Sequence, residues 1–265
     1  MGWRPLHWGE IDPSAPGGRP VFWAATGRSG GVSTGDFRSL NLATHVGDDP
    51  RSVGENRDRV RRWSGASALI TLSAVHGSDV VVVDDDVLEG ARAGHDPVAD
   101  AVVCARADIA LLAMGADCLT LAIVGDDDRT VAAVHCGWRG LAGDVVGATV
   151  ATLARLGVQP AHVVLGPAVC GACYPVSPER VDDVRATAPE GVTEASLVVC
   201  PDGQPGIDVR AGVTHRLQSL GVPGSQITSV ALCTVEEPDL FSFRRDGRTG
   251  RQGIVVTCGD RREDA

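Results

Sequence analysis

The chain has 265 residues, with 24 basic and 34 acidic side chains and a formal net charge of −10 at pH 7. This acidic balance excludes a general nucleic-acid binder, which needs a basic surface. Every basic residue is an arginine, so Schiff-base chemistry on lysine and a Walker-type phosphate lysine are excluded. Any bound phosphate must be held by arginine or by backbone N–H groups.

No targeting or membrane segment is expected. The N-terminal segment Met1–His7 lacks the apolar core of a signal peptide. The longest apolar stretch, residues 101–124, contains Arg106, Asp108 and Asp117, so it is not a membrane span. We therefore expect a cytoplasmic protein without membrane or nucleic-acid partners. Its eight cysteines are then free thiols or metal ligands and not a disulfide framework.

Helices are predicted at three places along the chain. After a Pro/Gly-rich surface loop, Asp12–Pro20, the segment Arg51–Ser64 is expected to form a helix. Asp49 is its expected N-cap, Pro50 occupies the first helical position and the next glycine ends it. The other two helices are predicted because apolar residues recur at about the spacing of a helical turn. They cover Leu141–Leu156 and Asp208–Leu220.

Short runs of β-branched residues bounded by Gly, Asp or Pro predict strands between these helices. They are Val80–Val83, Ala101–Val103, Leu121–Val124, Val131–Val134, Val163–Leu165 and Ile254–Val256. No fixed-period repeat, dividing linker or dinucleotide-binding glycine fingerprint accompanies them. The sequence therefore predicts a mixed α and β protein with one domain over residues 1–265.

Three metal-binding side chains stand at the ends of predicted strands. His76 and Cys118 each precede a strand, and His135 ends another. Strand ends converge when their strands are neighbours. Two imidazoles and one thiolate suit a catalytic zinc with one open position, and copper is the alternative metal. The alternative for each is a hydrogen-bonded histidine or a small buried thiol.

Other cysteines leave further alternatives open. Cys136 follows His135 directly, and neighbours on a strand point to opposite faces, so both cannot easily reach one ion. Cys170 and Cys173 form a single C-x-x-C pair. One such pair is weak support for a metal site, and two unlinked thiols in a loop is the simpler interpretation.

The sequence resembles the YfiH-like family, also called multicopper polyphenol oxidase or laccase-domain proteins. The resemblance rests on seven blocks in the same order, among them Val-His-Gly at 75–77, Ala-Asp-Cys at 116–118 and His-Cys-Gly-Trp-Arg-Gly at 135–140. Blocks near both ends, residues 28–33 and 241–251, extend it over nearly the whole chain. Five residues depart from the family's usual pattern, and none is a candidate ligand: Ala74, Gly115, Cys170 (usually Gly), Ala172 and Gln252. Of these, Ala74 and Gly115 stand next to the ligand motifs and could change the groups that support the ligands.

This resemblance implies an α+β fold, a single layered domain with mixed β-sheets flanked by helices. It also implies that His76, Cys118 and His135 are catalytic zinc ligands. Many members are described as purine nucleoside phosphorylases, acting on adenosine, inosine or methylthioadenosine, with adenosine deaminase activity. Purine nucleosides and phosphate are then the expected partners, and the oligomeric state is left open.

Phosphate and nucleoside binding need further polar residues. The arginine candidates are Arg28, Arg57, Arg139, Arg244 and Arg245, because no lysine is present. Asn41 is a candidate for the ribose or the base, and a turn-stabilising role is the alternative. Trp138 could stack on a purine, and Asp117 is expected to support the site from behind Cys118.

Three other functions compete with the nucleoside enzyme. A copper oxidase of phenols would need paired histidines, and the seven histidines include no His-x-His. A cysteine hydrolase would use Cys118 or Cys136 as nucleophile, as in the editing of peptidoglycan precursors attributed to this family. A binding module without catalysis is the fourth hypothesis.

Overall fold

The computed structural model describes residues 3–13 and 18–259. Residues 1–2 of the N-terminal segment, residues 14–17 of the predicted loop Asp12–Pro20 and residues 260–265 lie outside the described residues. Over the described residues, no helix is both long and apolar enough to cross a bilayer.

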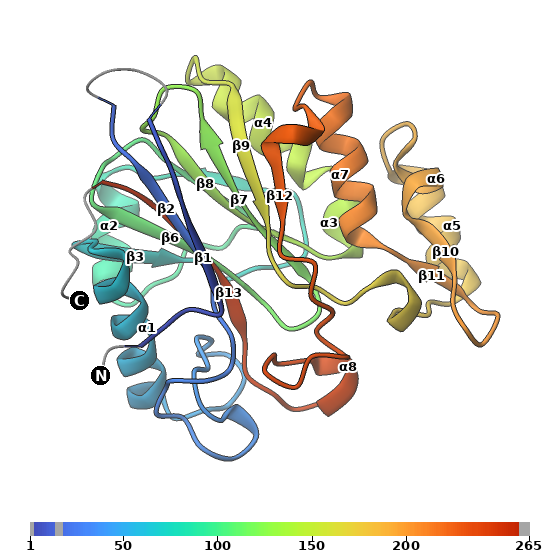
Figure 1. Cartoon of the computed structure of the whole chain (residues 1–265), viewed down its shortest axis with the longest axis horizontal. Helices are drawn as coiled ribbons and strands as arrows, with labels where there is room; N and C mark the ends of the chain where they lie inside the picture. Colours follow the sequence, from blue (N-terminus) through green and yellow to red (C-terminus); the bar gives the residue numbers. More distant parts are fainter. Residues whose placement is uncertain (1–2, 14–17, 260–265) are drawn as a thin grey trace.

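Two large mixed sheets form the centre of the molecule (Figure 1). The first has the strand order β1-β2-β13-β6-β3. Its strands are β1 (His7–Ile11), β2 (Val21–Ala25), β13 (Gln252–Cys258), β6 (Ile109–Gly115) and β3 (Ala68–Thr71). All pairs are antiparallel except β3 with β6.

The second sheet has the order β12-β9-β7-β8-β5-β4. Its strands are β12 (Ile227–Ser229), β9 (Pro160–Leu165), β7 (Leu119–Gly125), β8 (Val131–Cys136), β5 (Ala101–Cys104) and β4 (Val80–Val82). Its two outer pairs are parallel and its inner pairs antiparallel. A separate two-stranded ribbon pairs β10 (Leu197–Val199) with β11 (Pro205–Ile207).

The sheets pack face to face, with helices on both outer faces. The apolar layer between them includes Ile70, Leu111 and Val256 from the first sheet and Val102 and Val131 from the second. On the outer face of the first sheet lies α1 (Pro50–Ser64), while α2 (Asp85–Arg92) packs at the edge near β3. The outer face of the second sheet is covered by α3 (Trp138–Ala142), α4 (Val145–Arg155), α5 (Pro178–Thr187), α6 (Val192–Ser196) and α7 (Val209–Ser219). A short α8 (Phe243–Asp246) precedes β13.

The α+β class with mixed sheets is confirmed, as are all six predicted strands, most of which extend one or more residues further. The helix at 50–64 begins as predicted, because the Asp49 side chain accepts a hydrogen bond from the N–H of Arg51. The helix predicted over Leu141–Leu156 is wrong in one respect, since it is broken into α3 and α4. Asp144 interrupts it with a left-handed backbone and caps α4 through the N–H of Gly147.

Two of the segments that cross from one sheet to the other carry predicted metal ligands. The segment between β3 and β4 contains His76, and the turn between β6 and β7 contains residues 116–118. Each of these crossing segments joins the two layers covalently, so the positions of His76 and Cys118 depend on how the sheets are stacked.

Candidate active site

The three predicted ligands meet at one edge of the second sheet. Cys118 immediately precedes β7, whose first residue is paired with the last residue of the antiparallel strand β8. His135 is the penultimate residue of β8, and His76 precedes β4, which runs antiparallel to β8 across β5. One ligand atom from each side chain lies within 4.8 Å of the other two.

The local geometry leaves both histidine rings directed at the cysteine. The Nε2 atom of His76 is 3.8 Å from the Sγ atom of Cys118. The rings of His76 and His135 meet edge to face, with centroids 4.8 Å apart. His135 is buried, Cys118 is half-buried and His76 is exposed, so the cluster faces solvent on one side.

Asp100 organises this cluster from a fully buried position. Its carboxylate accepts hydrogen bonds from three successive backbone N–H groups, those of Val75, His76 and Gly77, at 2.7–3.3 Å. It also accepts one from Nδ1 of His135 at 2.9 Å. Because a carboxylate only accepts, Nδ1 carries a proton, and Nε2 is the nitrogen that a metal would bind once Nε2 has lost its own proton.

The charges within the cluster support one another. Burial opposes ionisation of Cys118, but hydrogen bonds from His135 and His76 outweigh it and lower the pKa of the thiol to about 6. Burial likewise opposes protonation of His135, and its contacts with Asp100 and Cys118 raise its pKa to about 9. The pKa of Asp100 is lowered despite burial, through His135 and the Gly77 N–H. A thiolate at neutral pH is the form that binds a metal or attacks a substrate.

The adjacent Cys136 is directed away from the cluster, as strand alternation predicts. Its side chain lies in the apolar layer under the helices. Burial keeps its pKa well above the usual range of a thiol, so Cys136 is neither a ligand nor a nucleophile in this arrangement.

Gly137 allows the ligands to approach each other. A Cβ atom at this position would lie 3.0 Å from Cys118 Sγ and 3.2 Å from His76 Cδ2. We therefore expect Gly137→Ala to displace both side chains and to weaken the affinity for a metal ion, probed with added zinc, by about 10- to 100-fold, measured by competition with a chromophoric chelator. Gly54→Ala is the matched control, because its Cβ would meet nothing within 4 Å. Equal zinc affinity of the two variants would contradict this role of Gly137.

The cluster forms part of the wall of a cavity of about 580 Å³. This is within the usual size range of small-molecule sites. The wall is contributed by both crossing segments, by the loop before α1 and by the segments around α5 and α8. Its residues are His45, Leu72, Ala74, His76, Met114, Gly115, Ala116, Asp117, Cys118, His135, Tyr174, Arg180, Phe243, Arg244 and Arg251.

Of the predicted substrate residues, only Arg244 is among these lining residues. Its guanidinium stacks on the ring of Tyr174, 4.8 Å from the centroid. The amide of Asn41 is buried and holds a turn, with Oδ1 accepting from the N–H groups of Ala43 and Arg251. This is the turn-stabilising alternative, and it places Asn41 behind Arg251.

The other four predicted arginines are engaged elsewhere. Arg28 donates to the carbonyl of Arg38 and covers a phenylalanine ring. Arg57 forms a two-point ion pair with Asp96. Arg139 stacks on the neighbouring Trp138. The guanidinium of Arg245 donates to the carbonyl oxygens of Thr234, Val235, Glu237 and Leu240.

Sequence reasoning missed Arg180, Arg251 and His45 at the cavity wall. Arg180 also contacts the ring of Trp138, 4.9 Å from its centroid. Burial lowers the pKa of Arg251. The pKa of His45 is also lowered, by burial and then by Arg251, so its ring is neutral at pH 7. His45 lies on a loop and Arg180 on α5, and neither belongs to a motif that the sequence offered. Arg251 ends one of the blocks shared with the family, but the block alone did not indicate that its side chain faces the cavity.

Asp117 fixes the turn that presents Cys118. Its backbone is left-handed, with φ of 96°. The carboxylate accepts hydrogen bonds from the hydroxyls of Thr234 and Ser242 and from the N–H of Arg244, all at 2.6–2.7 Å. The supporting role expected for Asp117 thus has a definite form: its carboxylate ties two later segments, the one with Thr234 and the start of α8, to the turn beside the thiol.

A comparison with known proteins gives this geometry its family context. Residues 22–259 match the family described as "Multi-copper polyphenol oxidoreductase laccase". A relative from Corynebacterium glutamicum named purine nucleoside phosphorylase is 36% identical over 250 residues, covering 93% of this chain and 98% of that protein. One from Streptomyces griseus with the same enzyme name is 40% identical over 242 residues, covering 90% and 94%.

The fold has a close counterpart among solved structures. The crystal structure of YlmD from Geobacillus stearothermophilus matches with a TM-score of 0.82 and 31% identity, over 98% of this chain and 99% of that one. The relatives' names indicate an enzyme like purine nucleoside phosphorylase, and the resemblance noted in the sequence is confirmed. With a match that covers residues 22–259 and so includes the whole cavity wall, this chain belongs to the laccase-like family of multi-copper polyphenol oxidoreductases.

Proposed function

We propose that the protein is a zinc-dependent purine nucleoside phosphorylase, acting on adenosine, inosine and methylthioadenosine, with adenosine deaminase as a second activity. One observation carries the proposal: His76, Cys118 and His135 share a cavity wall with Arg180, Arg244 and Arg251. A set of metal ligands and a set of anion-binding groups thus face the same space. The names of the relatives support the phosphorolytic part.

Phosphorolysis requires an anion held beneath C1′ of the ribose. In the reaction a phosphate oxygen forms a bond to C1′, the C1′–N9 bond breaks, and the departing purine takes up a proton. Arg180, Arg244 and Arg251 supply the positive charge for this anion, since guanidinium groups bind phosphate through paired N–H donors. Tyr174 and Phe243 offer aromatic faces for the base on the same wall.

Deamination requires water at C6 of adenine and a group that moves protons. Two imidazoles and one thiolate fit zinc, and a bound zinc ion with an open position lowers the pKa of coordinated water toward 7. Asp100 fixes the ring of His135 through Nδ1. The neutral ring of His45 can accept a proton at the same cavity wall.

The test is turnover of the purified protein with adenosine, in the presence and absence of phosphate. Adenine and ribose 1-phosphate should appear only with phosphate, and inosine should appear in both conditions. Elemental analysis of the same sample should find zinc and not copper. Absence of all three products would overturn the proposal. Phenol oxidation by a copper-containing protein would overturn it in favour of an oxidase.

Arg180 offers a test of phosphate binding. Replacing its guanidinium by an amide in Arg180→Gln removes a charge and its paired donors, so we expect KM for phosphate to rise by about 10-fold or more. KM should be measured with inosine in excess. Arg185→Gln is the control on the same helix, because its side chain is 59% exposed and outside the cavity wall. Similar KM values in both variants would remove Arg180 from the phosphate site.

A cysteine hydrolase is the second candidate, favoured by one observation. The low pKa of Cys118, beside a histidine that Asp100 orients, resembles the nucleophile, base and orienting group of thiol hydrolases. Chelation separates the two functions. Zinc removal should abolish nucleoside deamination, whereas a thiol hydrolase would keep its activity and would be inactivated by alkylation of Cys118.

A further inference from the structure

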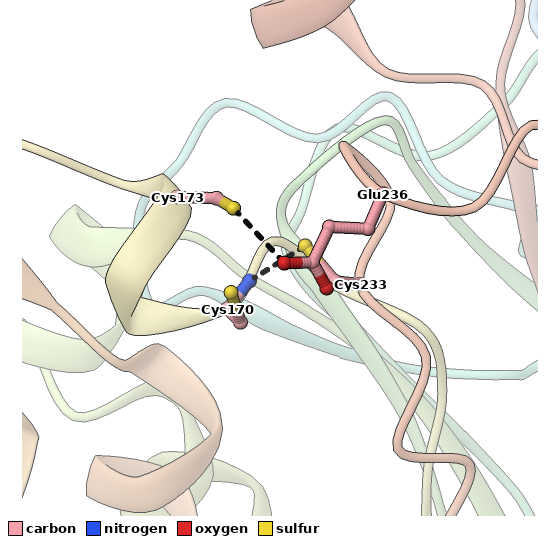
Figure 2. A group of neighbouring side chains, drawn as sticks. All are labelled: Cys170, Cys173, Cys233 and Glu236. Atoms are coloured by element: carbon pink, nitrogen blue, oxygen red, sulfur yellow. Dashed lines mark hydrogen bonds between the residues drawn. The ribbon is translucent and has the colours of Figure 1, made fainter. Parts of the chain in front are cut away.

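A second group of metal-binding side chains lies outside the candidate active site (Figure 2). It consists of Cys170, Cys173, Cys233 and Glu236, whose ligand atoms all lie within 4.8 Å of one another. Figure 2 shows the four side chains converging from two segments. Cys170 precedes the short 3₁₀ turn after β9 and Cys173 ends it, while the other two residues lie on the segment after β12.

The backbone holds these segments together without help from the four side chains. Ala168 and Cys233 form an isolated parallel bridge. The N–H of Ala168 donates to Leu232 O, and the N–H of Thr234 donates to Ala168 O, both at 3.2 Å. The N–H of Glu237 donates to Cys233 O at 2.9 Å, which forms the turn that brings Glu236 back over Cys233. Both ligand pairs therefore have the same spacing of three residues.

The ligand atoms, all within 4.8 Å of one another, are spaced closely enough for small side-chain movements to form a tetrahedral zinc site. Bonds of about 2.3 Å from zinc to sulfur place two thiolates about 3.8 Å apart in a regular tetrahedron. The Sγ atom of Cys173 is 3.6 Å from Oε1 of Glu236. The Sγ atom of Cys233 accepts a hydrogen bond from the N–H of Cys170 at 3.4 Å, as thiolate ligands do from backbone donors. Three sulfurs and one oxygen would fill all four positions, which is the arrangement of a structural zinc.

Burial and charge are also suitable. Cys233 is buried, Cys170 and Cys173 are half-buried and Glu236 is exposed, so an ion can reach the group from solvent. Two arginines frame it: Arg210 donates to the carbonyls of Gly166 and Leu232, and Arg245 to that of Thr234. Arg245 is already paired with Asp246 at 2.8 Å, so Arg210 is the arginine whose positive charge partly offsets the negative charge that three thiolates and a carboxylate leave after binding a divalent ion.

We propose that Cys170, Cys173, Cys233 and Glu236 bind a structural zinc ion, separate from the candidate catalytic one. Binding releases the protons of the three thiols and involves no change of oxidation state. The ion joins the two segments directly beside the cavity. Tyr174, which follows Cys173, lines that cavity. Thr234, which follows Cys233, donates its hydroxyl to Asp117 at the turn of Cys118.

Metal content per chain tests the proposal. The full-length protein, purified with a thiol reductant and without chelator, should contain two zinc ions by elemental analysis and native mass spectrometry. Cys118→Ser should retain one ion, held by the second group, and Cys173→Ser should retain the other. Cys200→Ser is the matched control and should retain both, because its thiol only donates to Gly171 O nearby.

Cobalt substitution gives a second, spectroscopic readout on the wild-type protein and on Cys118→Ser. The near-ultraviolet sulfur-to-cobalt absorption grows with the number of bound thiolates, so about three quarters of it should come from the second group. In Cys118→Ser most of this band should persist. A metal-free Cys118→Ser protein, or a disulfide among residues 170, 173 and 233 in place of a metal, would overturn the proposal. Either result would leave the proposed nucleoside chemistry at His76, Cys118 and His135 untouched.

Discussion

Cys118→Ser should lower adenosine deamination, as kcat/KM, by on the order of 10³-fold, equivalent to about 4 kcal/mol of transition-state stabilisation. The substitution removes the only sulfur among the three candidate ligand atoms of His76, Cys118 and His135, the proposed catalytic group. A hydroxyl with an ordinary pKa does not replace a thiolate whose pKa is about 6. Zinc content at the catalytic group should fall with the rate, and both quantities are measured on the same preparation.

Cys136→Ala is the matched control, because this sulfur is adjacent in sequence to His135 but faces the opposite side of β8. Its loss should cost about 1 kcal/mol of stability through a small core cavity and leave deamination unchanged. The assignment of Cys118 as the catalytic ligand would be wrong if both variants deaminated adenosine at the same rate. It would also be wrong if only Cys136→Ala lost the activity.

Asp100→Ala should destabilise the folded protein by about 3–5 kcal/mol, the second large effect. The substitution leaves a buried histidine and three backbone N–H groups without their acceptor, and each orphaned donor costs about 1–3 kcal/mol unless water reaches it. It also releases the loop of His76, whose backbone is held at a positive φ of 62°. Urea unfolding of the metal-free protein measures the loss in the free energy of unfolding.

Two variants sharpen this test. Asp182→Ala removes an exposed carboxylate paired with Arg185 and should change stability by less than about 1 kcal/mol. Asp100→Asn keeps an oxygen for the backbone donors but loses the charge. We expect an intermediate loss of stability and zinc affinity weakened by about 10- to 100-fold. Wild-type stability of Asp100→Ala would contradict the organising role assigned to this carboxylate.

Local chemistry explains how much of the fold the sequence predicts. Buried strands such as β7 and β8 are recognisable because β-branched runs end at Gly or Asp. The break between α3 and α4 cannot be recognised from the sequence, because Leu141 and Val145, on either side of the break, pack into the same core. The apolar periodicity therefore continues through Asp144, although the backbone does not.

The part of the candidate site that could be predicted from the sequence is the set of metal-binding side chains at the ends of predicted strands. His76, Cys118 and His135 form this set, and the structure brings them together. Asp100 does not stand out, because a single acidic residue before a buried strand resembles an ordinary exposed strand end. Glu236 is equally inconspicuous within Val-Glu-Glu-Pro, and only the fold places it opposite the C-x-x-C pair. The role of Arg245 was not predictable either, because its guanidinium binds backbone carbonyl oxygens that no sequence motif specifies.

The two crossing segments have a mechanical consequence. His76 and Cys118 lie on stretches of chain that pass between the sheets, while His135 belongs to the second sheet itself. An ion held by all three would link the two crossing segments to the second sheet, across layers whose shared interior is apolar and has no directional contacts of its own. Small shear of one sheet against the other would spread the ligands, so heating should release this ion before the layers separate, and its retention should report how firmly they remain in register.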